Sequence, residues 1–169
     1  MNLKQLQKTH LPILIMGETG TGKTHLATEI AKTSSKFLSL NIASLNENLF
    51  ESELFGHMKG AFSGAIYNRV GFCEEVGSGV LFLDEIGELS LKMQSKILTL
   101  IDQGIFYPVG STSSRHFRGR LILATNRNLK KMVEAGDFRE DLYYRLRFIE
   151  ILKKPIRERQ YFTLIIENM

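Results

Sequence analysis

Short apolar runs alternate with amphipathic segments along most of this chain. Each run is long enough for one buried strand, and glycines or other turn residues follow most of the runs. The predicted strands are residues 11–16, 37–42, 80–83, 106–109, 121–124 and 148–152.

The segments between these strands have the periodicity of helices. Ser90 is a good N-cap, and Met93, Ile97, Leu100 and Ile101 after it fall on one helical face. The other predicted helices are residues 23–32, 46–55, 128–136 and 137–145. The glycine-rich stretch 56–79 predicts loops or a hairpin, and the polar stretch 110–120 predicts a loop.

Strands that alternate with helices predict an α/β fold, with a parallel sheet covered by helices on both faces. A chain of 169 residues is the size of one domain with a single hydrophobic core. We therefore expect residues 1–169 to form one α/β domain.

A phosphate-binding loop connects the first predicted strand to the first helix. Its sequence is Gly17-Glu18-Thr19-Gly20-Thr21-Gly22-Lys23-Thr24. Glycines in such a loop let backbone N–H groups point at phosphates at the start of a helix. Lys23 can reach the β- and γ-phosphates, and the Thr24 hydroxyl can ligate Mg²⁺. The expected ligands are ATP and Mg²⁺.

Two carboxylates follow the buried strand 80–83. Asp84 and Glu85 therefore lie at the carboxyl edge of the sheet, where open α/β sheets bind ligands. We expect Asp84 to hold Mg²⁺ and Glu85 to polarise the attacking water. Asn126, which ends another strand, can reach the same water, although an asparagine there is often only a turn residue.

Charge, cysteine content and hydropathy narrow the possible partners. Residues 1–110 carry nine basic and eleven acidic side chains, whereas residues 111–169 carry thirteen and seven. The basic C-terminal part could bind nucleic acid, but it contains no recognition helix, and phosphates or an acidic neighbouring subunit explain the excess equally well. We expect no DNA binding by this chain.

The chain has no apolar run long enough to cross a membrane, and it has one cysteine, Cys73. We therefore expect a cytoplasmic protein without a membrane partner.

The segment Gly60-Ala61-Phe62-Ser63-Gly64-Ala65 lies between the two halves of the nucleotide site. It has no evident role in binding nucleotide. A phenylalanine between flexible glycines is poor core material but suits contact with a partner. The alternative is a hairpin tip that folds back on the domain.

The ordered series of motifs resembles the AAA+ ATPase domain of the sigma-54-dependent transcription activators of bacteria. The resemblance runs from Ile13 to Arg159 and includes the phosphate loop. The other matching segments are residues 51–57, 60–65, 81–90, 106–110, 124–127 and 138–146.

This resemblance implies an ATPase that assembles into a ring, usually a hexamer, and remodels sigma-54 RNA polymerase to open promoters. Residues 60–65 correspond to the family's Gly-Ala-Phe-Thr-Gly-Ala loop, which contacts the sigma-54 factor. Phe62 would make the main apolar contact, and Ser63 replaces the family's threonine. Residues 110–116 would form a second surface loop beside the first.

The resemblance also implies roles for three residues outside the phosphate loop. Asn41 matches the asparagine that holds the catalytic glutamate, here Glu85. Arg139 and Arg145 match arginines that reach into the site of the neighbouring subunit. The residues alone favour a different interpretation, in which these two arginines belong to a helix surface and pair with Glu140 and Asp141.

The chain departs from the family's pattern at several places. Thr24 and Met58 both stand where the family usually has glutamate. In the family, a helical lid with a sensor arginine would follow the position of Arg159. Residues 1–169 contain no such lid, no receiver domain and no DNA-binding helix-turn-helix. The resemblance therefore implies a AAA+ core that is shortened at both ends.

Two other functions remain open at this point. A core without its lid could be a nucleotide-binding fragment that does not hydrolyse ATP. A AAA+ helicase loader or remodelling chaperone is a third possibility, against which the loop around Phe62 and the segment 138–146 argue.

Overall fold

The computed structural model describes residues 2–155, so residues 156–159 of the family resemblance lie outside the described part. The main helices and strands are α1 (Leu3–Lys8), β1 (Ile13–Met16), α2 (Lys23–Ala31), β2 (Phe37–Asn41), α3 (Glu47–Phe55), β3 (Gly56–His57), β4 (Arg69–Val70), α4 (Phe72–Glu75), β5 (Val80–Asp84), α5 (Leu91–Gln103), β6 (Ile105–Phe106), β7 (Arg115–His116), β8 (Arg120–Thr125), α6 (Leu129–Ala135), α7 (Glu140–Leu146) and β9 (Glu150–Leu152). Two short 3₁₀ helices, η1 (Ile42–Ser44) and η2 (Ile86–Glu88), follow β2 and β5.

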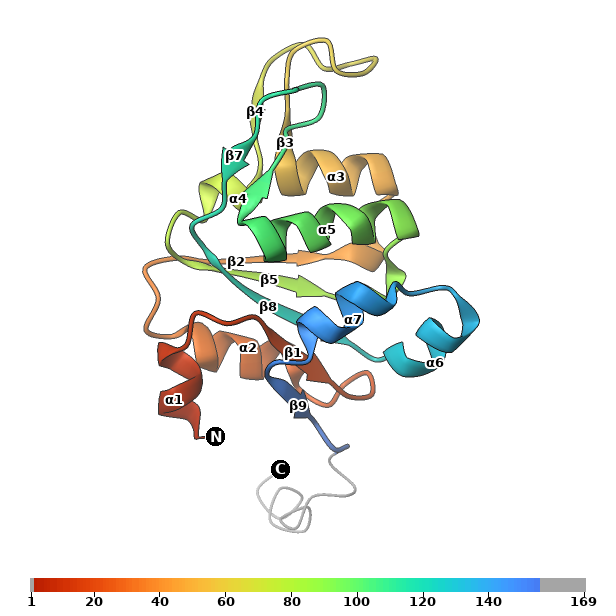
Figure 1. Cartoon of the computed structure of the whole chain (residues 1–169). Helices are drawn as coiled ribbons and strands as arrows, with labels where there is room; N and C mark the ends of the chain where they lie inside the picture. The colour runs from red at the N-terminus through yellow and green to blue at the C-terminus, as the bar shows by residue number, and fades with distance from the viewer. Residues whose placement is uncertain (1, 156–169) are drawn as a thin grey trace.

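A five-stranded sheet in the order β2-β5-β8-β1-β9 forms the centre of the molecule (Figure 1). All four neighbouring pairs are parallel, as the sequence predicted. The carboxyl ends of the strands therefore meet at one edge of the sheet.

Helices cover both faces of this sheet, which confirms the α/β prediction. Alternate residues of β8 point to opposite faces: Leu121 and Leu123 pack in the cluster that includes α3, α5 and α7, whereas Ile122 and Ala124 pack in the cluster that includes α1 and α2. Such alternation is what a strand buried on both faces requires. The helix that Ser90 caps is also confirmed, because its hydroxyl accepts a hydrogen bond from the Met93 N–H.

The glycine-rich stretch 56–79 contains the expected hairpin and one unexpected helix. β3 and β4 pair antiparallel, with Gly56 opposite Val70, and the connection between them projects beyond α3 (Figure 1). The short helix α4 follows, and it buries Cys73, so that burial raises the pKa of the thiol. Four residues are too few to produce a helical periodicity that sequence analysis can detect.

Three predicted boundaries are wrong. The run 106–109 gives only the last residue of β6, which pairs with β7 in a separate small sheet, because Pro108 has no N–H and Gly110 turns at φ 80°. The stretch 110–120, predicted as a loop, contains β7 and the first residue of β8. The helix predicted over 137–145 begins after Arg139, which occupies the N-cap position of α7, because the Asp137 N–H bonds to the Met132 carbonyl at the end of α6.

The short helix α1 was not predicted, and it docks through a buried arginine. Arg120, at the start of β8, donates to the Leu6 carbonyl at 2.6 Å and lies 3.5 Å from the Gln7 carbonyl. Burial lowers the pKa of this guanidinium. Arg120 therefore ties the C-terminal end of α1 to the amino edge of the sheet.

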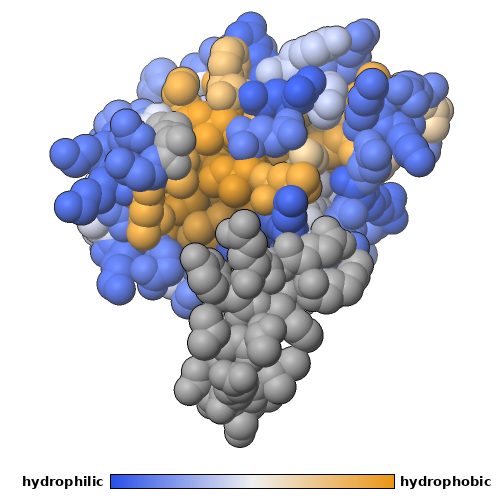
Figure 2. Space-filling view, turned by 90° about the horizontal axis from the view of Figure 1, so that it is seen from below, coloured by the Kyte–Doolittle hydropathy of each residue, from blue (hydrophilic) through white to orange (hydrophobic). Residues whose placement is uncertain are grey.

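The underside of the molecule has an area of apolar side chains bordered by polar ones (Figure 2). The sheet ends on this side at β9, which pairs only with β1 among the described strands. Leu11, Phe148 and Leu152, which lie close to these strands in the sequence, are all exposed. Within residues 2–155, no helix has the length and apolar character needed to cross a bilayer.

The base of the projecting hairpin depends on Gly71. A Cβ at this position would lie 2.1 Å from the Gly56 nitrogen and 2.7 Å from the Leu54 carbonyl oxygen. We predict that Gly71→Ala lowers the free energy of unfolding by about 3 kcal/mol, because backbone must move. Gly77→Ala is the control: that site is open but has φ 57°, so the loss should be about 1 kcal/mol. Urea denaturation measures both, and equal losses would contradict the prediction.

Candidate functional site

The phosphate loop connects β1 to α2 at the carboxyl edge of the sheet. Gly20 and Gly22 have φ values of 79° and 83°, in the left-handed region that favours glycine. The Thr21 hydroxyl donates to the Glu18 carbonyl at 2.9 Å and closes the loop. The loop thus places backbone N–H groups at the start of a nine-residue helix, as phosphate binding requires.

Lys23 lies inside this loop. Its side chain is buried, and its ammonium donates to the Gly17 carbonyl at 3.0 Å and lies 3.4 Å from the Glu18 carbonyl oxygen. The Glu85 carboxylate lies 3.7 Å from the same ammonium. The Lys23 ammonium therefore lies between the loop that would bind phosphates and the carboxylate of Glu85, the residue expected to polarise water.

Thr24 and Asp84 come together as the sequence predicted. The Thr24 hydroxyl lies 3.4 Å from an Asp84 carboxylate oxygen, and both belong to the edge that carries the phosphate loop. A hydroxyl and a carboxylate are hard oxygen donors of the kind that Mg²⁺ prefers together with phosphate oxygens. These two residues fit the expected ion.

Glu85 is held in a strained backbone conformation. It is the one non-glycine residue with positive φ in the described part of the chain, at φ 60° and ψ 49°. Its carboxylate accepts a hydrogen bond from the Asn126 N–H at 3.1 Å. The Asn126 amide in turn donates to the Thr19 hydroxyl of the phosphate loop at 3.1 Å. Glu85, Asn126 and the loop therefore form one connected group.

Asn41 lies beside this group without contacting Glu85 through a recorded hydrogen bond. It pairs in register with Asp84 across β2 and β5, and its side-chain oxygen accepts from the Ala43 N–H at 2.9 Å. In this structure Asn41 caps η1. Its expected role in holding Glu85 stays a prediction.

Arg139 and Arg145 lie on α7 and bond to nearby side chains. Arg139 donates to Asp141 at 2.7 and 3.0 Å and to the Ser95 hydroxyl at 3.0 Å. This hydrogen bond lowers the pKa of the Asp141 carboxyl. Arg145 pairs with Asp102 at 2.8 Å. The hydrogen bonds and the ion pair of these two arginines thus lead to Asp141, Ser95 and Asp102 rather than to their own phosphate loop.

The segment 60–65 forms the tip of the projecting connection. The Gly60 N–H bonds to the Ala65 carbonyl at 2.8 Å, and Gly60 and Gly64 have φ values of 82° and 101°. Phe62 is 46% exposed, and its ring packs edge-on against His57 with centroids 5.0 Å apart. Ile66 and Tyr67 beyond the tip are still more exposed.

The second predicted surface loop lies beside the first. The Met58 N–H bonds to the Val109 carbonyl at 2.9 Å, and the Val109 N–H bonds to Gly56 at the same distance. Gly110 packs against Ala61. A Cβ added at Gly110 would lie 2.7 Å from the Cβ of Ala61. Val109 and Gly110, where this loop begins, therefore contact the base of the tip.

Sequence analysis did not identify His57 and Ser52 as partners. The Ser52 hydroxyl, buried in α3, lies 2.7 Å from Nδ1 of His57. His57 is therefore anchored on one side and packs against Phe62 on the other. The pair spans five residues across a helix end, a spacing that identifies no known type of site.

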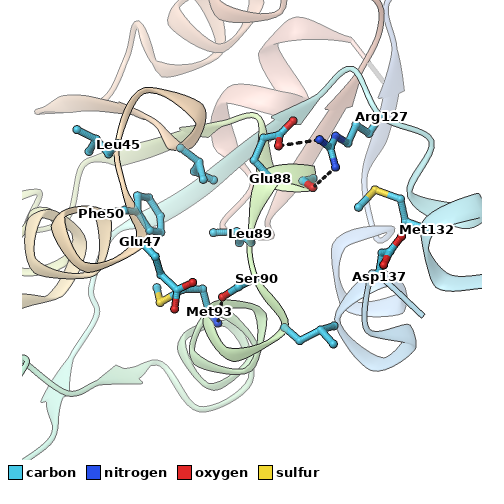
Figure 3. Close-up of a pocket in the computed structure, with 13 residues that line it drawn as sticks. Leu45, Glu47, Phe50, Glu88, Leu89, Ser90, Met93, Arg127, Met132 and Asp137 are labelled. Atoms are coloured by element: carbon cyan, nitrogen blue, oxygen red, sulfur yellow. Dashed lines mark hydrogen bonds and ion pairs between the residues drawn. The ribbon is translucent and has the colours of Figure 1, made fainter. Parts of the chain in front are cut away.

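Two hollows flank the strand ends. A groove of about 320 Å³ beside the phosphate loop is lined in part by Gly17, Glu18 and Asn126. A larger cavity of about 490 Å³ lies between α3, α5 and α6, and its lining includes Arg127 and Glu88 (Figure 3). No residue of the phosphate loop is among those that line this larger cavity.

His57 sets how far Phe62 is exposed. We predict that His57→Ala frees the ring, so that chymotrypsin cleaves after Phe62 about threefold faster or more. Tyr67, already 77% exposed, provides an internal reference for cleavage in the same digest. Lys59→Ala is the control substitution in the same loop. An unchanged ratio of the two cleavage rates would contradict this role of His57.

Comparison with known proteins agrees with the geometry. The sequence profile of the family described as the Sigma-54 interaction domain matches residues 1–152. The Nif-specific regulatory protein of Azotobacter vinelandii is 46% identical over 161 residues, which cover 93% of this chain and 31% of that protein. The sigma54-dependent transcriptional activator SfnR of Pseudomonas putida is 43% identical, over 94% of this chain and 44% of that protein.

Solved structures of relatives show the same fold. The crystal structure of NtrX from Brucella abortus in complex with ADP aligns with a TM-score of 0.87 and 30% identity, over 98% of this chain and 37% of NtrX. The complex of NtrX with ATP aligns with a TM-score of 0.85. The chain spans about a third of the length of the Nif-specific regulators that it matches. By its profile match and its fold, this chain belongs to the sigma-54 interaction domain family of AAA+ proteins.

Proposed function

We propose that this chain is the ATP-hydrolysing core of a sigma-54-dependent transcription activator. The observation that carries the proposal is the connected group at the sheet edge: Lys23, Glu85 and Asn126 contact one another or the phosphate loop in one continuous network. Glu85, the expected general base, is 16% exposed, so it is sheltered yet reachable by water. The relatives bound to ADP and ATP support nucleotide as the ligand.

In the proposed mechanism, the N–H groups of the loop and the Lys23 ammonium bind the β- and γ-phosphates of ATP. Thr24 and Asp84 would hold Mg²⁺, which would neutralise phosphate charge. Glu85 polarises the attacking water, and the Asn126 amide orients it. Arg139 and Arg145 act on the site of an adjacent copy, as the family resemblance implies, since their side chains bond to Ser95, Asp141 and Asp102 rather than to their own phosphate loop.

The route from the nucleotide site to the projecting tip is short in the chain. Strand β2 ends at Asn41, η1 leads into α3, and α3 continues directly into β3 at the base of the tip. Glu51 of α3 is buried and pairs with Lys96 of α5, so this ion pair joins the two helices. A movement at Asn41 would therefore be carried by α3 to Phe62.

The proposed partners follow from this arrangement. Phe62, with the rest of Gly60-Ala61-Phe62-Ser63-Gly64-Ala65, contacts the sigma-54 factor of RNA polymerase. Copies of the activator form a ring, a hexamer in the family, in which arginines cross between subunits. The proposed setting is the bacterial cytoplasm, and direct DNA contact is not part of this chain's role.

ATP turnover per subunit at increasing protein concentration tests the proposal. We predict that turnover rises with concentration, because Arg145 completes the site of another copy. Lys23→Ala and Arg145→Ala should each lower turnover by about 100-fold or more. Mixing the two variants should restore part of the activity, since each supplies what the other lacks.

The matched control is Lys32→Ala, which removes an exposed charge from the end of α2 and should leave turnover unchanged. Turnover that does not depend on concentration, or that survives Arg145→Ala, would contradict the action of arginines between copies. ADP binding without turnover at any concentration would favour the non-hydrolysing alternative.

A further inference from the structure

Arg127 bridges two segments at the carboxyl edge of the sheet. Its guanidinium donates to the Glu88 carboxylate at 2.7 Å and to the Gly87 carbonyl at 3.3 Å (Figure 3). Its own N–H bonds to the Thr125 hydroxyl at 3.0 Å, which fixes the backbone from which the side chain extends. The guanidinium thus holds η2, after β5, to the end of β8.

Gly87 makes room for this bridge. A Cβ on Gly87 would lie 3.0 Å from Cδ of Arg127 and 3.0 Å from the Thr125 hydroxyl oxygen. Gly87 has no positive φ, so its backbone does not require glycine. The Arg127 side chain occupies the space that a side chain at position 87 would need.

The two bridged segments carry the central residues of the proposed reaction. Glu85 comes immediately before η2, and Asn126 immediately before Arg127. The backbone pairing between β5 and β8 ends at Leu83 and Leu123. Neither Glu85 nor Asn126 therefore belongs to the ladder between these two strands. Their mutual contact, Asn126 N–H to the Glu85 carboxylate, lies beyond the last backbone pair. Side-chain contacts must therefore hold the two segments together here.

The strain at Glu85 makes such a restraint necessary. A glutamate in the left-handed region is unfavourable and persists only where its surroundings hold it. The Arg127 bridge closes a ring of contacts around this residue: Asn126 binds its carboxylate, and Arg127 binds the turn that follows it. Loss of the bridge would free that turn.

We propose that Arg127 is a positioning residue for hydrolysis, which keeps the Glu85 carboxylate aligned with Asn126. This inference rests on the proposed function. The Arg127 side chain is 47% exposed and that of Glu88 is 35% exposed, on the wall of the 490 Å³ cavity. An ion pair this exposed adds little to stability, so its removal should affect alignment more than folding.

The test compares Arg127→Met, which keeps an apolar stem but loses both hydrogen bonds, with wild type. Without nucleotide, the backbone N–H of Asn126 should exchange its hydrogen about fivefold faster or more in Arg127→Met than in wild type, because its hydrogen bond to Glu85 opens more often. Nuclear magnetic resonance measures this exchange in the chain as it is. Arg127→Lys, which keeps the charge but not the fork of two donors, should give an intermediate rate.

Kinetics provide the second readout. The turnover number of Arg127→Met should fall about tenfold, as expected for a misaligned water-polarising group. ADP affinity should stay within about twofold and the melting temperature within about 2 °C, since the phosphate loop and the core are untouched. Lys36→Met is the matched control: it breaks a similarly exposed pair with Glu75 at the other end of the sheet.

Unchanged exchange at Asn126 in Arg127→Met would overturn the inference. So would a fall in turnover that Lys36→Met reproduces, or one explained by weaker ADP binding. If wild type shows no turnover at any concentration, the proposed function fails, and the exchange rate of Asn126 still decides whether Arg127 holds the two segments.

Discussion

Parallel pairing of β1, β8 and β5 determines at which edge of the sheet the nucleotide site forms. The ladder brings the ends of these strands to one edge, so that Gly17, Asp84 and Asn126, far apart in the sequence, become neighbours. Burial of alternate side chains on both faces fixes the register, because a slip by one residue would exchange the faces of each strand. The chemistry therefore depends on packing of residues such as Leu123 and Ile122, which never contact a nucleotide.

The backbone ladder stops short of the groups that would carry out hydrolysis. Glu85 and Asn126 follow the last paired residues, and side-chain hydrogen bonds hold them instead. Such contacts are weaker and easier to rearrange than a ladder, as the proposed change of the site between nucleotide states would require. In the proposed account, the same flexibility at the strand ends is transmitted through α3 to the tip that carries Phe62.

The sequence predicted the central sheet and the phosphate loop because both produce local signals. Apolar runs marked every strand of the central sheet, and the glycine spacing before Lys23 identified the loop. Short elements such as α1 and β7 were missed, since a few residues carry no periodicity. The Arg127–Glu88 bridge also could not be predicted from the sequence, because it joins side chains of residues that are 39 positions apart. The same holds for the packing of Phe62 on His57, which depends on the turn at the loop tip.

The central claim is that the nucleotide state of the site controls contact between the tip and the sigma-54 factor. Binding of purified sigma-54 factor to this chain, with ADP alone and with ADP plus aluminium fluoride, tests it directly. The account predicts binding about tenfold tighter or more with the mimic of the transferring phosphoryl group, and loss of that gain in Phe62→Ala. Equal binding in the two nucleotide states, or a gain that Phe62→Ala keeps, would contradict the account.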